Sequence, residues 1–163
     1  MATYVLVHGA WHGGWCWKRV APLLRAAGHE VYTYTPTLTG LGERAHLLSR
    51  DIDLDTHITD IVNVLAYEEL TDVVLVGHSY GGMVIAGVAD RVPERVAHLV
   101  YLDAFVPRDG QAVHDIFSPE FAAHLQALAL AEGDGWRIPA PPAASYGVTA
   151  AADLAWVAAK TSP

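Results

Sequence analysis

The sequence has a single cysteine and no cluster of basic residues among its 163 positions. Because Cys16 has no partner, an intrachain disulfide is excluded, and a reducing cytoplasm is the expected location. Cys16 itself lies among tryptophans, and we expect it to be a packing residue rather than a nucleophile. With 10 Lys and Arg against 18 Asp and Glu, the formal net charge is −8. We therefore expect no nucleic acid and no membrane as a partner.

Long apolar runs are also missing. No stretch approaches the roughly 18 consecutive apolar residues of a membrane span. The N-terminus has no basic region followed by an apolar segment of signal-peptide length. Hydrophobic residues make up 52% of the chain and charged residues 17%, which indicates one globular domain with a real core. No internal repeat is present.

The first two thirds of the chain alternate between short apolar strands and amphipathic helices. Val-, Ile- and Tyr-rich runs are followed by apolar residues at helical spacing and by Gly or Pro stops. We expect strands at 4–7, 30–34, 73–76 and 96–102, helices at 15–27, 55–69 and 80–91, and a loop with a short helical turn at 36–51. Asp55 is expected to cap the helix at 55–69. This order predicts an α/β fold with a mostly parallel sheet and helices on both faces.

The last third shows no strand pattern. The Pro-rich segment IPAPPAASYG joins two expected helices, near 119–132 and near 150–160. We divide the chain into residues 1–107, the N-terminal part of an α/β core, and residues 108–163, a helical cap or lid segment. The cap is expected to cross the carboxyl edge of the sheet.

The clearest motif is VLVGHSYGG at residues 74–82, where an apolar strand breaks into glycines around one serine. The spacing Gly77-x-Ser79-x-Gly81 predicts a tight strand-to-helix turn that holds the Ser79 hydroxyl in a strained, exposed position. Ligands collect at the carboxyl ends of parallel strands, and a helix N-terminus favours a developing anion. We predict that Ser79 is a nucleophile. The alternative is a glycine-rich turn with an incidental serine.

A second motif, VLVHGAWHGGW at residues 5–15, ends another strand in a His-Gly pair beside the predicted nucleophile. Acyl transfer needs two N–H donors where the carbonyl oxygen becomes negative. The main-chain N–H groups of Ala10 and Tyr80 are the candidates for this oxyanion hole. We expect His8 to orient the loop rather than to act as a base. His12 is expected either to line the pocket or to support the turn.

The segments LVHGAWHGGWCW, LLRAAGHEV and LVGHSYGG resemble the α/β-hydrolase superfamily. Within it, they are similar to the branch of plant methylesterases, hydroxynitrile lyases and bacterial carboxylesterases. The resemblance is close over residues 3–107 and loose over the rest. It implies that Ser79 is the nucleophile, that Ala10 and Tyr80 supply the oxyanion hole, and that residues 108–163 form part of a lid over an apolar pocket. It implies no metal and no organic cofactor.

Members of this family continue past the cap into two more strands, whose loops bring the catalytic acid and the catalytic histidine. We therefore expect a C-terminally incomplete core in which the strand at 96–102 is an exposed apolar edge. A second copy of the chain or a complementing C-terminal fragment could pair with it. Within the chain, His114, His124 and Asp103 are the candidates to assist Ser79. The alternatives are packed or solvated lid histidines and a pocket-wall or strand-capping aspartate.

Three functions remain open at this point. The first is a serine hydrolase that cleaves small, apolar carboxylic esters through an acyl-enzyme on Ser79. The second is a hydroxynitrile lyase-like catalyst, although plant lyases carry a threonine where this chain has Gly9. The third is a non-catalytic ligand-binding protein or an inactive fragment without the catalytic histidine. We predict that Ser79→Ala abolishes ester turnover without unfolding the domain, and that the 163-residue chain alone turns esters over very slowly.

Overall fold

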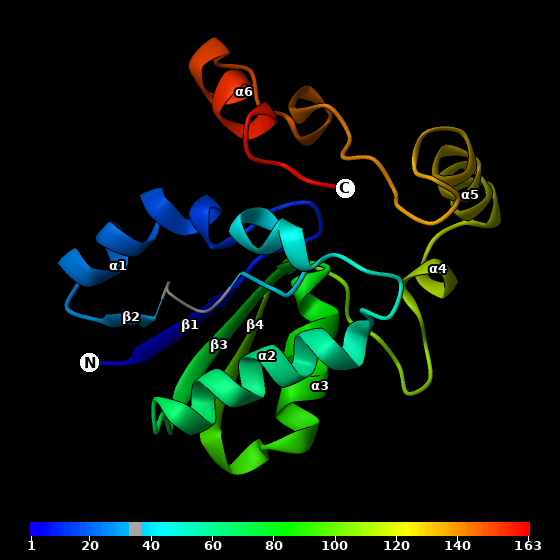
Figure 1. Ribbon diagram of the computed structural model, residues 1–163. Helices are drawn as coiled ribbons and strands as arrows, with labels where there is room; N and C mark the ends of the chain where they lie inside the picture. Colours follow the sequence, from blue (N-terminus) through cyan, green and yellow to red (C-terminus); the bar gives the residue numbers. More distant parts are fainter. Residues whose placement is uncertain (33–36) are drawn as a thin grey trace.

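The computed structural model describes residues 1–32 and 37–163 (Figure 1). Within these residues the strands form one parallel sheet in the order β2-β1-β3-β4. The strands are β1 (Thr3–Val7), β2 (Glu30–Tyr32), β3 (Val73–Ser79) and β4 (Val96–Ala104). This confirms the predicted parallel α/β sheet. Residues 33 and 34, which we expected to extend β2, lie outside the described residues.

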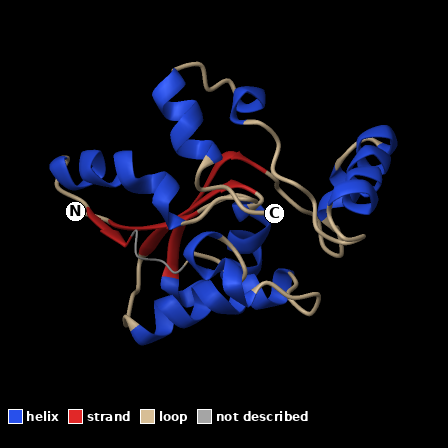
Figure 2. Ribbon diagram, turned by 45° about the horizontal axis from the view of Figure 1, so that its top comes forward, coloured by secondary structure: helices blue, strands red, loops and turns tan. Residues whose placement is uncertain are grey.

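Helices cover both faces of this sheet (Figure 1, Figure 2). One face carries α2 (Leu54–Tyr67) and α3 (Gly81–Arg91), and the other carries the 3₁₀ helix η1 (Gly14–Arg19) and α1 (Ala21–Ala26). Alternation along β1 supplies both cores, because successive side chains of a strand point to opposite faces. Val5 and Val7 pack with the α2–α3 side, whereas Leu6 packs with Trp17 and Ala21.

The helix expected at 15–27 is wrong as a single element. The structure divides it into η1 and α1, with Val20 between them. Pro22, in the first turn of α1, has no N–H to donate to the carbonyl four residues earlier, so one α-helix cannot run through it. The expected stop is confirmed, since Gly28 takes up φ +84° just beyond α1.

The N-terminal cap of α2 also differs from our expectation. The capping residue is Asp53 rather than Asp55, and its carboxylate accepts a hydrogen bond from the Thr56 N–H at 2.9 Å. The Asp53 N–H in turn donates to Oγ1 of Thr56 at 3.5 Å, which completes a reciprocal capping box. This cap fixes the helical register that places His57 and Ile61 on the buried side of α2.

β4 is the exposed apolar edge that the sequence predicts. It pairs with β3 on one side, and within residues 1–32 and 37–163 no strand pairs with its other side. Leu99, Val100 and Leu102 are 37, 40 and 48% exposed. Val100 and Leu102 alternate onto the α1 side of the sheet, beyond the reach of the helices that bury its centre.

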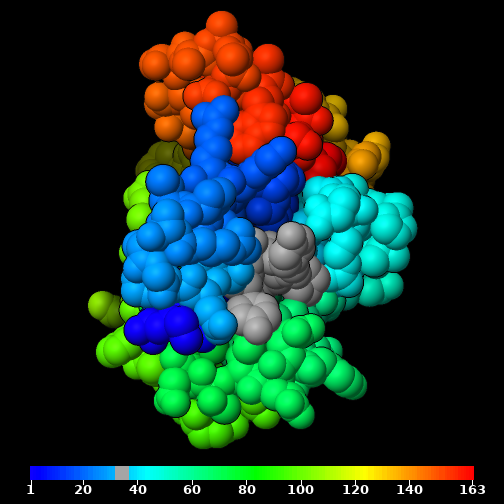
Figure 3. Space-filling model, turned by 90° about the vertical axis from the view of Figure 1, so that its left-hand side faces the viewer, coloured from blue at the N-terminus to red at the C-terminus, as the bar shows by residue number. Residues whose placement is uncertain are grey.

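The chain after β4 forms α4 (Val113–Ile116), α5 (Pro119–Glu132), the 3₁₀ helix η4 (Ala143–Tyr146) and α6 (Ala151–Ala158). This confirms the two helices expected near 119–132 and 150–160. In Figure 3 the orange and red C-terminal segment rests on the blue residues that follow β1. The Arg19–Asp153 ion pair at 2.6 Å and the edge-on contact of the Trp15 and Trp156 rings at 5.0 Å hold it there. Among the described helices, none is long and apolar enough to cross a membrane.

Candidate active site

Ser79 lies at the last position of β3, directly before α3, in the turn that the glycine spacing predicts. Its φ of +52° lies in the left-handed region, which a residue with a Cβ rarely adopts. Such a conformation costs on the order of 1–3 kcal/mol and persists only where the surroundings hold it. The Ser79 side chain is half-buried. The expected strained turn is therefore present.

The glycines on either side of Ser79 allow backbones to approach closely. A Cβ on Gly77 would lie 2.5 Å from the carbonyl oxygen of Gly81. A Cβ on Gly81 would lie 2.7 Å from the carbonyl oxygen of Val7, at the end of the neighbouring strand β1. Neither distance leaves room for a methyl group. The two glycines thus let β3, α3 and the end of β1 meet around one serine.

The loop after β1 lies against this turn. A Cβ on Gly9 would be 3.0 Å from the Ser79 Cβ and 3.2 Å from Nδ1 of His78, so position 9 faces the serine directly. Ala10 follows immediately, and Tyr80 is the N-cap residue of α3. Ala10 and Tyr80 line the same cavity. Ala10 and Tyr80 are thus the chain neighbours of Gly9 and Ser79, the two positions that contact each other.

His8 has both ring nitrogens bonded to the main chain. Nε2 accepts a hydrogen bond from the Leu38 N–H at 3.0 Å, and Nδ1 therefore carries the proton and donates to the Gly9 carbonyl at 2.8 Å. The side chain is 2% exposed, and this burial lowers the pKa of His8 to about 4. A histidine without a free lone pair holds the loop in place, as we expected, and does not act as a base.

His12 supports the same loop. Its Nδ1 donates to the carbonyl of Ala10 at 2.8 Å, and its ring stacks on Trp15 with centroids 5.2 Å apart. Of the two roles that the sequence left open, the structure shows the support of the turn. Cys16 packs at the edge of the α1-side core, and burial raises the pKa of its thiol to about 12. A thiol held neutral in this way is a packing residue.

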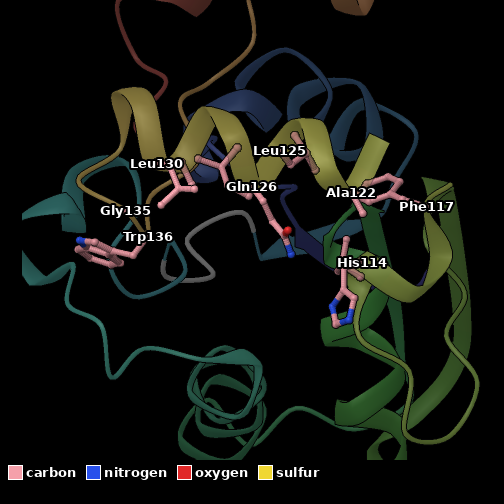
Figure 4. A pocket seen from close by; sticks show the side chains of 11 residues that line it. His114, Phe117, Ala122, Leu125, Gln126, Leu130, Gly135 and Trp136 are labelled. Atoms are coloured by element: carbon pink, nitrogen blue, oxygen red, sulfur yellow. The ribbon is translucent and has the colours of Figure 1, made fainter. Parts of the chain in front are cut away.

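A cavity of about 280 Å³ opens beside Ala10 and Tyr80. Its wall combines the loop after β1, the segment before α2, α2 itself, the start of α3 and the chain after α5, and includes Ala10, Trp11, Thr39, His57, Tyr80 and Arg137. The indole N–H of Trp11 donates to the carbonyl of Ile138 at 2.8 Å, which ties the cap to the loop after β1. A second, larger cavity of about 560 Å³ lies under α5 and is mainly apolar, with His114, Gln126 and Trp136 in its wall (Figure 4).

None of the candidate base and acid side chains hydrogen-bonds to Ser79 in the described part of the chain, although Asp103 lies between Leu102 and Ala104, which pair with His78 and Ser79. The His114 side chain is 69% exposed, and its Nε2 lies 3.0 Å from the Asp115 carboxylate. His124 is exposed on α5, where its ring lies near Phe121. Asp103 is exposed at an irregularity at the end of β4, with φ +44°. Within the described part of the chain, Ser79 Oγ hydrogen-bonds to none of these three side chains.

One group of residues near the site was missed by the sequence analysis. The hydroxyl of Tyr80 lies 2.9 Å from Nδ1 of His57, and Nε2 of His57 lies 2.9 Å from the carbonyl oxygen of Thr39. A signal was present, since His57, Ile61 and Leu65 follow one another at a spacing of four on α2. A histidine in such an apolar row is buried, although the row does not identify its partners. No group of three or more possible metal-binding side chains occurs among the described residues.

The chain resembles known hydrolases in sequence and structure. The model of the Alpha/beta hydrolase family matches residues 4–163. The carbendazim hydrolyzing esterase of Nocardioides sp. (strain SG-4G) is 50% identical over 149 residues, which cover 86% of this chain and 61% of that protein. Methylesterase 1 of Arabidopsis thaliana is 40% identical over 115 residues, covering 64% of this chain and 40% of the relative.

Solved structures show the same similarity. An extracellular α/β-hydrolase from a Paenibacillus species superposes with a TM-score of 0.88 at 31% identity, covering 100% of this chain and 66% of that chain. Polyneuridine aldehyde esterase superposes with a TM-score of 0.77 at 24% identity, which supports the fold alone. The chain therefore spans 61% of the length of the Nocardioides protein and 66% of the Paenibacillus chain.

Proposed function

Because the chain belongs to the alpha/beta hydrolase family, we propose that it is a serine esterase, or the nucleophile-bearing part of one, acting on small apolar carboxylic esters. The observation that carries the proposal is the strained Ser79 at the end of β3, with φ +52° at the start of α3. A nucleophile elbow explains a left-handed serine held between a strand and a helix. The esterase names of the sequence relatives point the same way.

In the proposed reaction, Ser79 Oγ attacks the ester carbonyl carbon while a base takes the hydroxyl proton. The carbonyl oxygen becomes negative and receives hydrogen bonds from the main-chain N–H groups of Ala10 and Tyr80. The N-terminus of α3, which has 11 residues, adds its positive dipole end at the same place. The C–O bond to the alcohol then breaks, the alcohol leaves with the proton, and water hydrolyses the acyl-enzyme.

We propose that the base and the acid are supplied by a segment that adds to the free edge of β4. Two observations support this. The described residues offer Ser79 no hydrogen-bonded histidine, and β4 leaves apolar side chains such as Leu102 exposed beside an unpaired edge. Further chain of the same protein, a complementing C-terminal fragment or a second copy could occupy the edge by strand addition.

The test is ester hydrolysis by the wild type and by Ser79→Ala, with p-nitrophenyl acetate as the probe and with any native sequence that follows residue 163 included. We expect Ser79→Ala to lose turnover and to keep the wild-type melting temperature. Ser145→Ala, at an exposed serine of η4, serves as the matched control. Mass spectrometry should find the acyl group on the peptide that contains Ser79. If Ser79→Ala retained turnover, Ser79 would not be the nucleophile and the proposal would be wrong.

A ligand-binding role without catalysis is the second candidate, favoured by the absence of a histidine on Ser79 in the described part of the chain. It predicts saturable binding of esters without turnover, unchanged by Ser79→Ala. Lyase chemistry has less support. Gly9 faces Ser79 but offers no hydroxyl to a cyanohydrin.

A further inference from the structure

A short chain of hydrogen bonds lies behind the proposed oxyanion hole. The carbonyl of Thr39 can only accept, so Nε2 of His57 carries the proton and donates to it at 2.9 Å. Nδ1 of His57 is then free to accept the hydroxyl proton of Tyr80, whose oxygen lies 2.9 Å away. His57 is 8% exposed, and the two bonds satisfy both of its ring nitrogens. Neutral His57 with its proton on Nε2 therefore satisfies both contacts, with the Tyr80 hydroxyl as the donor to Nδ1.

The far end of this chain is fixed by a second set of bonds. The N–H of Thr39 donates to one carboxylate oxygen of Asp60 at 2.7 Å, and its hydroxyl donates to the other at 2.9 Å. Arg44 pairs with the same carboxylate at 3.4 Å. Because His57 and Asp60 both belong to α2, the Thr39 segment is held to that helix by its carbonyl, its N–H and its side chain. The Tyr80 hydroxyl is thus bonded to a group that has little freedom to move.

Tyr80 is the residue that follows the strained Ser79. A left-handed serine relaxes unless its neighbours prevent the main chain from rotating. The glycine contacts constrain the N-terminal side of the turn, and the Phe105 N–H donates to the Ser79 carbonyl at 3.1 Å. On the C-terminal side, the side chain of Tyr80 is anchored by His57. That anchor acts on the residue whose main-chain N–H is a proposed oxyanion donor.

We propose that His57 is a positioning residue: by accepting the Tyr80 hydroxyl, it keeps the main-chain N–H of Tyr80 aimed at the oxyanion site beside Ser79. The part of this proposal that concerns turnover rests on the proposed esterase function. The positioning itself is a property of the folded chain and can be measured without substrate. His57 does not touch the reacting atoms and acts through Tyr80.

Protonation of His57 would reverse the direction of the bond between its Nδ1 and the Tyr80 hydroxyl. A protonated ring has two donors and no lone pair, so the Tyr80 hydroxyl could no longer donate to Nδ1 and would have to accept from it. Burial, the largest influence, lowers the pKa of His57, and burial likewise raises the pKa of Tyr80, which therefore remains a donor. The charged or titratable groups around His57 come from four other parts of the fold as well as from α2 itself: Asp53, Asp60, Arg44, His8, Tyr80 and Arg137.

The substrate-free test is NMR on the wild-type protein. We expect the ring nitrogens of His57 to report a proton on Nε2 alone at pH 7.5. On acidification, the amide signal of Tyr80 should move with the same midpoint as the His57 ring. In Tyr80→Phe and in His57→Leu, amide hydrogen exchange at position 80 should accelerate by about tenfold, since one anchoring bond is lost. Tyr67→Phe, at a tyrosine that is 85% exposed on α2, is the matched control and should leave that exchange unchanged.

The kinetic test separates positioning from substrate binding. In Tyr80→Phe we expect kcat for p-nitrophenyl acetate to fall by about tenfold while KM stays within about twofold. The double variant with His57→Leu should fall no further than either single variant, because both remove the same bond. His57→Gln keeps one donor and one acceptor without a titrating ring. This variant should keep most of the wild-type kcat. Its pH–rate profile should lack the fall at acidic pH that has the same midpoint as the His57 ring.

The outcomes are decisive in both directions. If amide exchange at position 80 of Tyr80→Phe stayed within about twofold of wild type, the proposal would be overturned, whatever the turnover. The hydrogen bond to His57 would then not restrain the main chain at that position. Should His57→Leu fail to fold, Tyr80→Phe carries the test alone, since it removes a single oxygen. A protein whose position 80 behaves as expected but which hydrolyses no ester in any variant would refute the esterase function and leave the positioning established.

Discussion

Lowering the pH should unfold this protein partly through His8, and one substitution can isolate that contribution. His8 is 2% exposed and uses Nε2 as an acceptor from the Leu38 N–H, so the folded state binds a second ring proton poorly. Burial, the largest influence, lowers the pKa of His8 from 6.5 to about 4. The unfolded chain has no such penalty. Because the unfolded state therefore binds the proton at a higher pH, the free energy of unfolding falls as the pH falls.

The size of the effect follows from those two pKa values. Above about pH 7 neither state is protonated and the contribution of His8 is complete. Between pH 7.5 and 5.5 the free energy of unfolding should fall by about 1.4 kcal/mol, and by about 3 kcal/mol once pH 4 is reached. A loss of about 3 kcal/mol is a large part of the 5–15 kcal/mol that roughly spans the stability of native proteins.

The assay is urea unfolding at pH 7.5, 6.5, 5.5 and 4.5, followed by circular dichroism. Burial also lowers the pKa values of His57 and His78, so the wild-type curve alone sums several groups. His8→Gln removes the titration at position 8 while its amide can still bond to the main chain. The difference between the two proteins then reports His8. His46→Gln, at an exposed histidine of the 3₁₀ helix η2 (Gly42–Leu47), should show the wild-type dependence.

We expect the wild type to lose about 1.4 kcal/mol more than His8→Gln between pH 7.5 and 5.5. Parallel curves for the two proteins would refute the reasoning, because they would mean that folding does not change the proton affinity of His8. A wild type that gains stability on acidification relative to the variant would show the opposite sign and require a charged partner for the ring.

Three further substitutions test the turn and the sheet edge. Gly77→Ala places a Cβ 2.5 Å from the Gly81 carbonyl oxygen and should cost about 3 kcal/mol in urea unfolding; an unchanged midpoint would mean that the two backbones lie further apart. Ser79→Gly should be about 1 kcal/mol more stable than Ser79→Ala, because only glycine adopts the left-handed φ without strain. This difference corresponds to a rise of about 2–4 °C in melting temperature. Equal melting temperatures would argue against strain at Ser79. Leu102→Lys should weaken any self-association in gel filtration and change stability by no more than about 0.5 kcal/mol, and unaltered association would place the contact away from β4.

Much of the fold could be predicted because its signals are local. The apolar runs that form β1 and β3 alternate with helical periodicity within a few residues, and the Gly77-x-Ser79-x-Gly81 spacing encodes its turn in five positions. The split between η1 and α1 also had a local signal in Pro22, which acts on the residues before it. The prediction of one helix over 15–27 gives the helical spacing of apolar residues more weight than the N–H that Pro22 lacks.

The contacts around the site could not be predicted in the same way. Thr39, His57 and Tyr80 lie on three separate segments, and their hydrogen bonds join residues that are 18 and 23 positions apart. The register of α2 determines which side His57 faces, but the partner depends on where the segment before α2 crosses the start of α3. The position of that crossing cannot be predicted from a single sequence.

The two strained residues next to the proposed oxyanion hole illustrate the difference. Ser79, with φ +52°, was predicted because glycines on both sides make room for its turn. Trp11, with φ +62°, was not, because nothing near it in the sequence favours a left-handed tryptophan. Distant segments hold it instead: its indole N–H donates to Ile138, and its carbonyl accepts from the Ser162 N–H at 2.9 Å. Strain that neighbouring glycines accommodate is therefore visible in the sequence, whereas strain that the cap maintains appears only once the cap is in place.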